Sequence, residues 1–150
     1  MEKRLILITG SVMNSNPESV NTYNELVRII NPEKYEISSP LDTMQFKGTD
    51  EERYQRAVKM LSKTSLMIAE MSNVSTGQGM EIQQAAILGI PILVIAKNGS
   101  KVSGLVKGCP VVKKVVYYED VKELENTIGN FIEEETNEKH CDNWRKWWFR

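Results

Sequence analysis

A segment in the middle of the chain combines glycine, hydroxyl and carboxyl groups at a spacing suited to anion or sugar binding. It covers residues 70–81 and has the sequence EMSNVSTGQGME. Gly77 and Gly79 allow a ligand to approach the backbone closely, directly before a predicted helix. The first N–H groups of that helix have no partner within it and favour a phosphate or the oxygens of a sugar. Ser72 and Ser75 either add hydroxyl donors to this site or cap and solvate the loop.

Glu81 follows this loop, in the first turn of the predicted helix 79–88. At that position the helix dipole is expected to favour the charged form of the carboxylate, which suits a nucleophile better than a general acid. The alternative is that Glu81 only complements the dipole, as acidic residues in first turns commonly do. Both interpretations stay open on spacing alone.

A second glycine-containing segment, Thr9 to Val12, follows an apolar run near the start of the chain. Gly10 allows close backbone approach and Ser11 can donate a hydrogen bond, although a tight turn would need glycine there in any case.

The end of the chain offers a different chemistry. Tryptophans within Trp144–Trp148 alternate with basic residues, a pattern that either stacks bases or docks on the domain or a partner subunit; we favour docking.

The elements that must position these residues alternate between apolar runs and helical patterns. Strands are predicted at residues 4–9, 35–38, 66–69, 91–96 and 111–118, and helices at 18–30, 50–63, 79–88 and 121–132. Asp50 is the predicted N-cap of the second helix, and a loop is predicted over 40–48. The apolar run 91–96 is expected to be buried on both faces.

Alternating strands and helices predict an α/β fold with a parallel sheet covered on both faces. We predict a single-domain, doubly wound sheet of five strands in the order 2-1-3-4-5, flavodoxin-like or Rossmann-like, over residues 1–132. A polar and aromatic tail is predicted over 133–150. In this order ligands bind beyond the carboxyl ends of the first and third strands. The loops 10–16 and 72–79 are therefore expected to hold the function.

Composition excludes several classes of function. The 150 residues include 19 basic and 20 acidic side chains, a balance that argues against nucleic-acid binding as this chain's function. No apolar run approaches the ~20 residues of a membrane span, and no signal peptide is recognisable, so we expect a cytoplasmic protein without membrane contact. Two cysteines and the single His140 cannot build a zinc site or a convincing Ser-His-Asp triad. We expect no metal and no cofactor.

The stretches Ala69–Ile82 and Ala85–Leu93 together resemble the signature of the nucleoside 2-deoxyribosyltransferase family. In that family a strand ends in an acidic residue, and a Pro-Ser-Leu-Gly-x-Gly-Tyr-Glu-like loop opens a helix ahead of Gly-Lys-Pro. The segment Ile8–Val12 resembles the family's Gly-Ser loop. Val102–Gly108 is similar to the corresponding segment in the branch of the family that hydrolyses 2'-deoxynucleoside 5'-monophosphates. The resemblance covers residues 4–132 in order. We therefore expect the domain at residues 1–132 to be similar to this family.

The resemblance implies that Glu81 attacks the anomeric carbon of a deoxyribose and expels the base. The covalent glycosyl-enzyme then passes to water or to another base, so one difficult displacement becomes two easier ones. It also implies that Ser75 and Gly77 bind a 5'-phosphate, and that Gly10 and Ser11 line the sugar pocket.

The same resemblance places Val12, Gly79 and Leu105 in the substrate-binding segments. It implies that Ser103 reaches the active site of a neighbouring subunit, because the family assembles as homodimers or larger homo-oligomers. The expected small-molecule partner is a nucleoside or its 5'-monophosphate.

Two positions depart from the family pattern. Ala57 stands where the family has a helix aspartate, and Met13 stands where the monophosphate hydrolases have an arginine. Arg53 and Tyr54 lie on the same predicted helix face as Ala57 and are candidates to replace the aspartate. The departures favour an alternative function, a catalytically degenerate nucleotide-binding or sensing module. A third hypothesis is a ribosyl hydrolase that acts on NAD or a cytokinin-type nucleotide.

Overall fold

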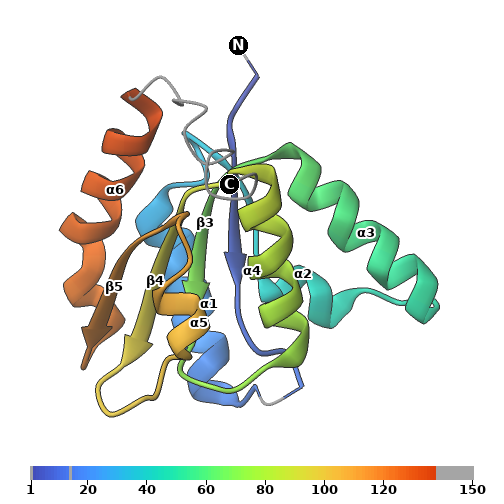
Figure 1. Ribbon diagram of the computed structural model, residues 1–150, viewed down its shortest axis with the longest axis horizontal. Coiled ribbons are helices and arrows are strands. Elements are labelled where there is room, and N and C mark those ends of the chain that lie inside the picture. The colour runs from blue at the N-terminus through green and yellow to red at the C-terminus, as the bar shows by residue number, and fades with distance from the viewer. Residues whose placement is uncertain (1, 14, 138–150) are drawn as a thin grey trace.

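A computed structural model describes residues 2–13 and 15–137 of the chain, which form a parallel sheet with helices on both faces (Figure 1). The strands are β1 (Leu5–Thr9), β2 (Glu36–Ser38), β3 (Thr64–Glu70), β4 (Ile92–Lys97) and β5 (Val112–Tyr118). Their order is β2-β1-β3-β4-β5, and all neighbouring pairs are parallel. The predicted fold class and strand order are confirmed.

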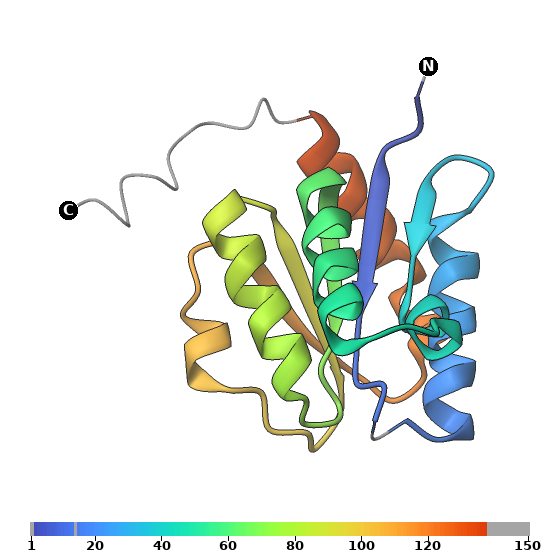
Figure 2. The same ribbon diagram turned by 90° about the vertical axis from the view of Figure 1, so that its right-hand side faces the viewer.

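The helices lie in two layers on either side of the sheet (Figure 2). They are α1 (Pro17–Ile30), α2 (Pro40–Gln45), α3 (Asp50–Lys63), α4 (Thr76–Leu88), α5 (Gly104–Lys107) and α6 (Glu125–Asn137), with a 3₁₀ turn at Val121–Leu124. Helices α1 and α6 pack on one face of the sheet through one hydrophobic core. Helices α3, α4 and α5 pack on the other face through a second core. Within the described residues, no helix combines the length and apolar character that a membrane crossing needs.

Successive side chains of a strand point to opposite faces of the sheet, so neighbouring residues belong to different cores. On β3, Leu66 and Ile68 belong to the core under α1 and α6, whereas Met67 and Ala69 belong to the core under α4. The inner strand β4 is fully buried from Ile92 to Ala96, as its unbroken apolar run predicts. The sheet therefore separates two hydrophobic cores.

The start of α4 differs from the prediction. The helix begins at Thr76 rather than at Gly79, because the Ser75 side chain caps it by accepting a hydrogen bond from the Gln78 N–H. Gly77 and Gly79 consequently lie within the first turn of α4 instead of in the preceding loop. Glu81 lies in the second turn, so its predicted place in the first turn is wrong.

Two other predictions are corrected by capping interactions. Residues 40–45 form the short helix α2 rather than a loop, because Ser39 and Asp42 make a reciprocal capping box at its start. Thr49, not Asp50, is the N-cap of α3, where it forms a second capping box with Glu52.

Helix α3 has the predicted extent but buries few of its apolar residues, and the last predicted helix differs in extent. Tyr54, Val58 and Leu61 follow helical spacing along α3, but only Leu61 is buried, while Tyr54 is 61% exposed and Val58 38% exposed. The predicted last helix is divided into the 3₁₀ turn and α6, which continues past Ile132 to Asn137. The aromatic segment at 144–148 and His140 lie outside the described residues.

Candidate active site

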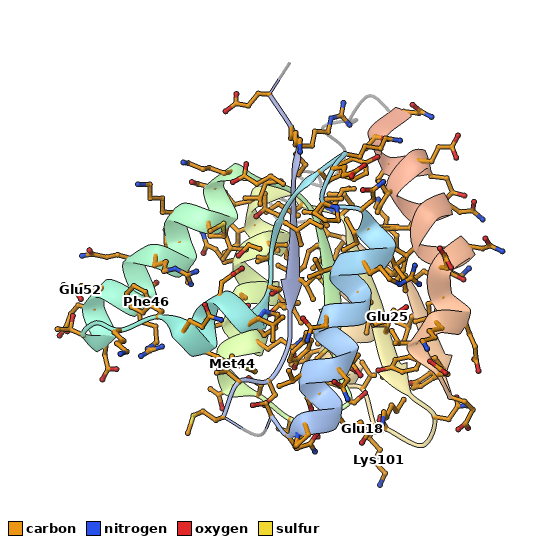
Figure 3. The ribbon with its side chains drawn as sticks, turned by 180° about the vertical axis from the view of Figure 1, so that it is seen from behind. Glu18, Glu25, Met44, Phe46, Glu52 and Lys101 are labelled. Atoms are coloured by element: carbon orange, nitrogen blue, oxygen red, sulfur yellow. The ribbon has the colours of Figure 1, made fainter. Side chains whose placement is uncertain are left out.

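The carboxyl ends of the strands point toward one edge of the sheet, where α1 and α4 begin (Figure 1). This edge is where the strand order reverses between β1 and β3, the position at which ligands bind in open parallel sheets. The loop after β1 and the connection from β3 to α4 meet there, as predicted. Figure 3 shows Glu18 of α1 and Lys101 of the β4–α5 connection at this same end of the molecule.

Glu81 of α4 is held by the last residue of β1. The hydroxyl of Thr9 donates a hydrogen bond to Glu81 Oε2. Burial raises the pKa of Glu81 above its ordinary value, and the hydrogen bond from Thr9 acts in the opposite direction. The expectation that the helix dipole favours the charged form is therefore wrong, because burial has the larger effect and Glu81 lies beyond the first turn.

A second carboxyl, that of Glu70 at the end of β3, lies on the opposite face of the sheet. Its side chain is only 3% exposed. Oε1 of Glu70 accepts hydrogen bonds from the Ser72 hydroxyl, from the Ser72 N–H at 3.1 Å and from the Tyr118 hydroxyl at 3.1 Å. Burial raises the pKa of Glu70, and these donors partly offset the effect. Ser72 is thus occupied in holding Glu70.

Gln78 connects the two strand ends from within the first turn of α4. It is 2% exposed, and its Nε2 donates to the carbonyl oxygens of Thr9 at 3.1 Å and of Glu70 at 2.9 Å. Thr9, Glu70 and Gln78 belong to the sequence motifs, but the motifs alone predict no role for them. The available signal was a polar residue ending each of two otherwise apolar strands, and a glutamine between two glycines.

The glycines on the two sides of this edge have different surroundings. A Cβ on Gly10 would lie 2.4 Å from Tyr23 Oη, so the absence of a side chain is required by the packing of that ring. The Tyr23 hydroxyl then donates to the carbonyl of Ser11 at 2.9 Å and fixes the loop. A Cβ on Gly77 or Gly79 would meet nothing within 4 Å. Space for a ligand is therefore available beside α4.

A cavity of about 380 Å³ brings together several of the predicted residues. Ser75 and Gly79 line it from the start of α4, and Ser103 and Leu105 line it from α5. Ser103 also caps α5 by accepting a hydrogen bond from the Leu105 N–H at 3.3 Å. Within one chain, Ser103 thus shares a cavity with the predicted phosphate-binding loop. Gly77 and Glu81 are not among its lining residues.

A cavity of about 450 Å³ lies on the other side of the sheet edge and has a polar lining. Glu70, Ser72 and Tyr118 belong to its wall, and Asn73 lines both cavities. At its rim Lys97 forms an ion pair with Glu18. None of the residues predicted to bind substrate lies in its lining.

The loop after β1 contains the remaining predicted residues. Ser11 is buried and Val12 is half-buried, and the Val12 carbonyl accepts hydrogen bonds from the N–H and hydroxyl of Ser15. Met13, which stands at the position of the family's arginine, is 96% exposed. The loop thus presents an apolar side chain at its tip.

The residues considered as replacements for the helix aspartate are engaged elsewhere or exposed. The guanidinium of Arg53 lies 5.5 Å from the centre of the Phe46 ring. Figure 3 places Phe46 at the outer turn between α2 and α3, away from the start of α1. Tyr54 is 61% exposed, and Ala57 is half-buried. The structure therefore gives neither Arg53 nor Tyr54 a place beside Glu81.

Comparison with known proteins finds solved structures that share this fold. No family model matches the chain. A CMP N-glycosidase from Clostridium botulinum has a TM-score of 0.64 at 15% identity, covering 83% of this chain and 98% of that one. A 2-deoxyribosyltransferase from Bacillus psychrosaccharolyticus also has a TM-score of 0.64 at 15% identity, covering 81% and 90%. The fold is that of the 2-deoxyribosyltransferase class.

A closer relationship is given by a protein of Methanosarcina mazei assigned the name 2'-deoxynucleoside 5'-phosphate N-hydrolase 1. It is 30% identical over 137 residues, which cover 87% of this chain and 84% of that protein. The chain belongs to the 2'-deoxynucleoside 5'-phosphate N-hydrolase family of enzymes.

Proposed function

We propose that this enzyme cleaves the N-glycosidic bond of a 2'-deoxynucleoside 5'-monophosphate, with Glu81 as the nucleophile. The observation that carries the proposal is the hydrogen bond from Thr9 to Glu81 Oε2 at the carboxyl edge of the sheet, beside the glycine-containing start of α4. This contact fixes one carboxylate oxygen and leaves Oε1 to react. Family membership supports the same chemistry.

In the first step Glu81 Oε1 forms a bond to the anomeric carbon C1' while the bond from C1' to the base nitrogen breaks. The electron pair of that bond leaves with the base, which takes up a proton. In the second step water attacks C1' and gives up a proton, which balances the proton taken up by the base; the ester bond breaks and the carboxylate is regenerated with release of deoxyribose 5-phosphate. A 2-deoxy sugar lacks the electron-withdrawing 2'-hydroxyl, so its oxocarbenium-like transition state forms more readily.

The environment of Glu81 suits a nucleophile that must be both charged and reactive. Burial raises the pKa of Glu81, so the ionised carboxylate is more basic than an exposed one and donates its electrons more readily. The Thr9 hydroxyl stabilises the charged form before attack. As Glu81 forms the ester it loses its negative charge, so the hydrogen bond from Thr9 becomes weaker. We therefore expect this hydrogen bond to have only a moderate effect on the rate.

The start of α4 supplies a site for the 5'-phosphate. The N–H groups of Thr76 and Gly77 are in the first turn and have no partner within the helix. Gly77 and Glu81 are separated by about 6 Å along the helix axis, at about 1.5 Å per residue. This distance is comparable to the width of a deoxyribose between C1' and its 5'-phosphate. The arrangement therefore favours a monophosphate over a nucleoside.

Incubation with a panel of substrates tests this proposal. The panel contains deoxynucleoside and ribonucleoside 5'-monophosphates, the nucleosides themselves and NAD, each with and without a second free base. We expect chromatography to detect free base from deoxynucleoside monophosphates and water as the acceptor. A new nucleotide formed with the added base would indicate transfer instead of hydrolysis. Release of nicotinamide from NAD would favour the third hypothesis, a ribosyl hydrolase.

The alternative of a non-catalytic nucleotide-binding module is supported by Ala57 and Met13, which replace the family's aspartate and arginine. Binding of a deoxynucleotide in calorimetry, with no base released from any member of the panel, would establish this alternative and reject the enzymatic proposal.

We also propose that the protein is a homodimer or larger homo-oligomer in which Ser103 lies near the pocket of a partner subunit. Exposed apolar side chains on α4 support an interface: Met80 is 56% exposed, Ile87 48% and Leu88 43%. Analytical ultracentrifugation tests the assembly. A monomer at tens of micromolar protein would reject it.

A further inference from the structure

One buried amide joins the ends of two strands at the proposed site. Gln78 Nε2 donates to the carbonyl of Thr9 at 3.1 Å and to the carbonyl of Glu70 at 2.9 Å. Thr9 is the last residue of β1 and Glu70 is the last residue of β3, and these strands are neighbours in the sheet. A single nitrogen in the first turn of α4 thus fastens both strand ends to the helix.

The orientation of this amide is determined by its partners. A rotated amide would place Oε1 against two carbonyl oxygens, neither of which can donate a hydrogen bond. In the observed orientation Oε1 is buried and has no hydrogen-bond partner among the described residues. An unpaired buried acceptor lowers stability, so packing alone does not account for a glutamine at this position.

The same helix contacts Thr9 a second time. Glu81 lies three residues after Gln78 on α4, on a neighbouring part of the helix surface, and accepts the hydrogen bond from the Thr9 hydroxyl. The main chain of Thr9 is therefore held by Gln78, and its side chain is held against Glu81. A change in the first contact displaces the donor of the second.

We propose that Gln78 is a positioning residue for Glu81: by fixing the end of β1 against α4, it aims the Thr9 hydroxyl at Oε2 and leaves Oε1 oriented for attack. This inference rests on the proposed function for its catalytic consequence. Its geometric part, the coupling of Gln78 to Glu81 through Thr9, does not depend on the substrate.

The kinetic test compares Gln78→Met with Gln84→Met. Methionine has a length similar to that of glutamine but no hydrogen-bond donor, and Gln84 is a half-buried residue further along the same helix. With a deoxynucleoside 5'-monophosphate as substrate, we expect Gln78→Met to lower kcat on the order of 10- to 100-fold, because small errors in placing a reacting group have such effects. KM should change little. Gln84→Met should keep the wild-type kcat.

A titration provides a measurement that needs no activity. The pKa of the Glu81 carboxyl is followed by ¹³C NMR in the wild type, Gln78→Met, Thr9→Val and the double variant. Gln78→Met and Thr9→Val should each raise the pKa of Glu81, because each removes the hydrogen bond that stabilises its charged form. The double variant should show no further rise, since both changes act through Thr9.

Several outcomes would overturn the inference. Folded Gln78→Met with the wild-type kcat and an unchanged pKa of Glu81 would reject it, as would shifts that add in the double variant. If Gln78→Met does not fold by circular dichroism, Gln78→Asn replaces it. This side chain keeps the amide but is too short to reach both carbonyls, so a smaller shift in the same direction is expected. If the wild type cleaves no nucleotide, the proposed function fails while the titration still decides the coupling.

Discussion

The two sides of the sheet edge each contain a carboxyl withdrawn from solvent, Glu70 buried and Glu81 half-buried, and the two carboxyls are held in different ways. Glu70, under α1 and α6, is 3% exposed, and one of its oxygens accepts three hydrogen bonds from Ser72 and Tyr118. Glu81, in α4 on the other face of the sheet, accepts from Thr9 the one hydrogen bond found for it in the described part of the chain. Burial raises the pKa of both. The pKa shifts of the two carboxyls therefore have the same direction, and the number of hydrogen-bond donors differs between them.

The glycines repeat this contrast. Gly10 has no side chain because Tyr23 occupies the space where a Cβ would lie, whereas Gly77 adjoins open space. Packing thus closes the loop after β1 at Gly10, whereas the first turn of α4 borders open space. Each side of the edge also has a cavity, so the two sides differ in the surroundings of their glycines and in the hydrogen bonds of their carboxyls.

The largest expected effect concerns catalysis by the two carboxyls. Glu81→Gln keeps the shape of the side chain but removes the attacking oxygen's charge, so we expect kcat to fall by several orders of magnitude with little loss of nucleotide binding. Glu70→Gln should change kcat less than about tenfold, because Glu70 acts through the structure only. Both rates are measured by release of free base.

Two results would break the contrast between the carboxyls. A Glu81→Gln variant that keeps most of the wild-type rate would make Glu81 a structural residue. A folded Glu70→Gln variant as inactive as Glu81→Gln would place Glu70 in the chemistry.

The glycine contrast predicts a difference in stability. Gly10→Ala should lower the free energy of unfolding by about 1–3 kcal/mol, because its Cβ would overlap the Tyr23 ring. Gly77→Ala should leave that free energy unchanged or raise it by up to about 1 kcal/mol through helix propensity. Urea unfolding measures both. Equal losses in the two variants would show that α4 is as tightly packed here as the loop after β1.

The activity should depend on pH through Glu81. Because the carboxylate must be ionised to attack, kcat should rise with pH through the pKa of Glu81 and be lost as pH falls below it. Burial raises this pKa, so the acidic limb should lie above the range of an exposed glutamate. Thr9→Val removes the hydrogen bond that lowers the pKa of Glu81, so the acidic limb should move to still higher pH. At a pH within the limb, kcat should then be several-fold lower than in the wild type. A limb that stays in place in Thr9→Val would contradict the role of the hydroxyl.

The smallest expected effect is the pH dependence of stability due to Glu70. Its raised pKa means that the folded protein holds this proton more tightly than the unfolded chain, so stability falls as pH rises from the ordinary glutamate pKa to the raised one. A separation of one pH unit between the two titrations corresponds to about 1.4 kcal/mol. Glu70→Gln should remove this decrease, measured as the unfolding free energy at several pH values. An unchanged slope would mean that Glu70 is ionised in the fold as readily as in solution.

Much of the fold was predictable because hydrophobic periodicity is a local property. The apolar runs ending at Thr9 and Tyr118 gave strands close to those observed, and the alternation of strands and helices gave the parallel sheet and its order. The errors lie at helix starts. Capping by Ser75 and by Thr49 depends on which hydroxyl meets which N–H, and several neighbouring residues could have served equally in the sequence.

The sequence by itself determined the architecture, the edge of the sheet where the loop after β1 meets the start of α4, and the glycine-rich start of α4 with Glu81 after it. These follow from residue type and spacing, which act over a few positions of the chain. Only the tertiary structure decided that Glu70 and Glu81 lie on opposite faces, that Thr9 holds one of them, and that Gln78 ties β1 to β3. Those contacts join segments up to 72 residues apart. Their geometry depends on strand register and helix docking, which no local pattern specifies.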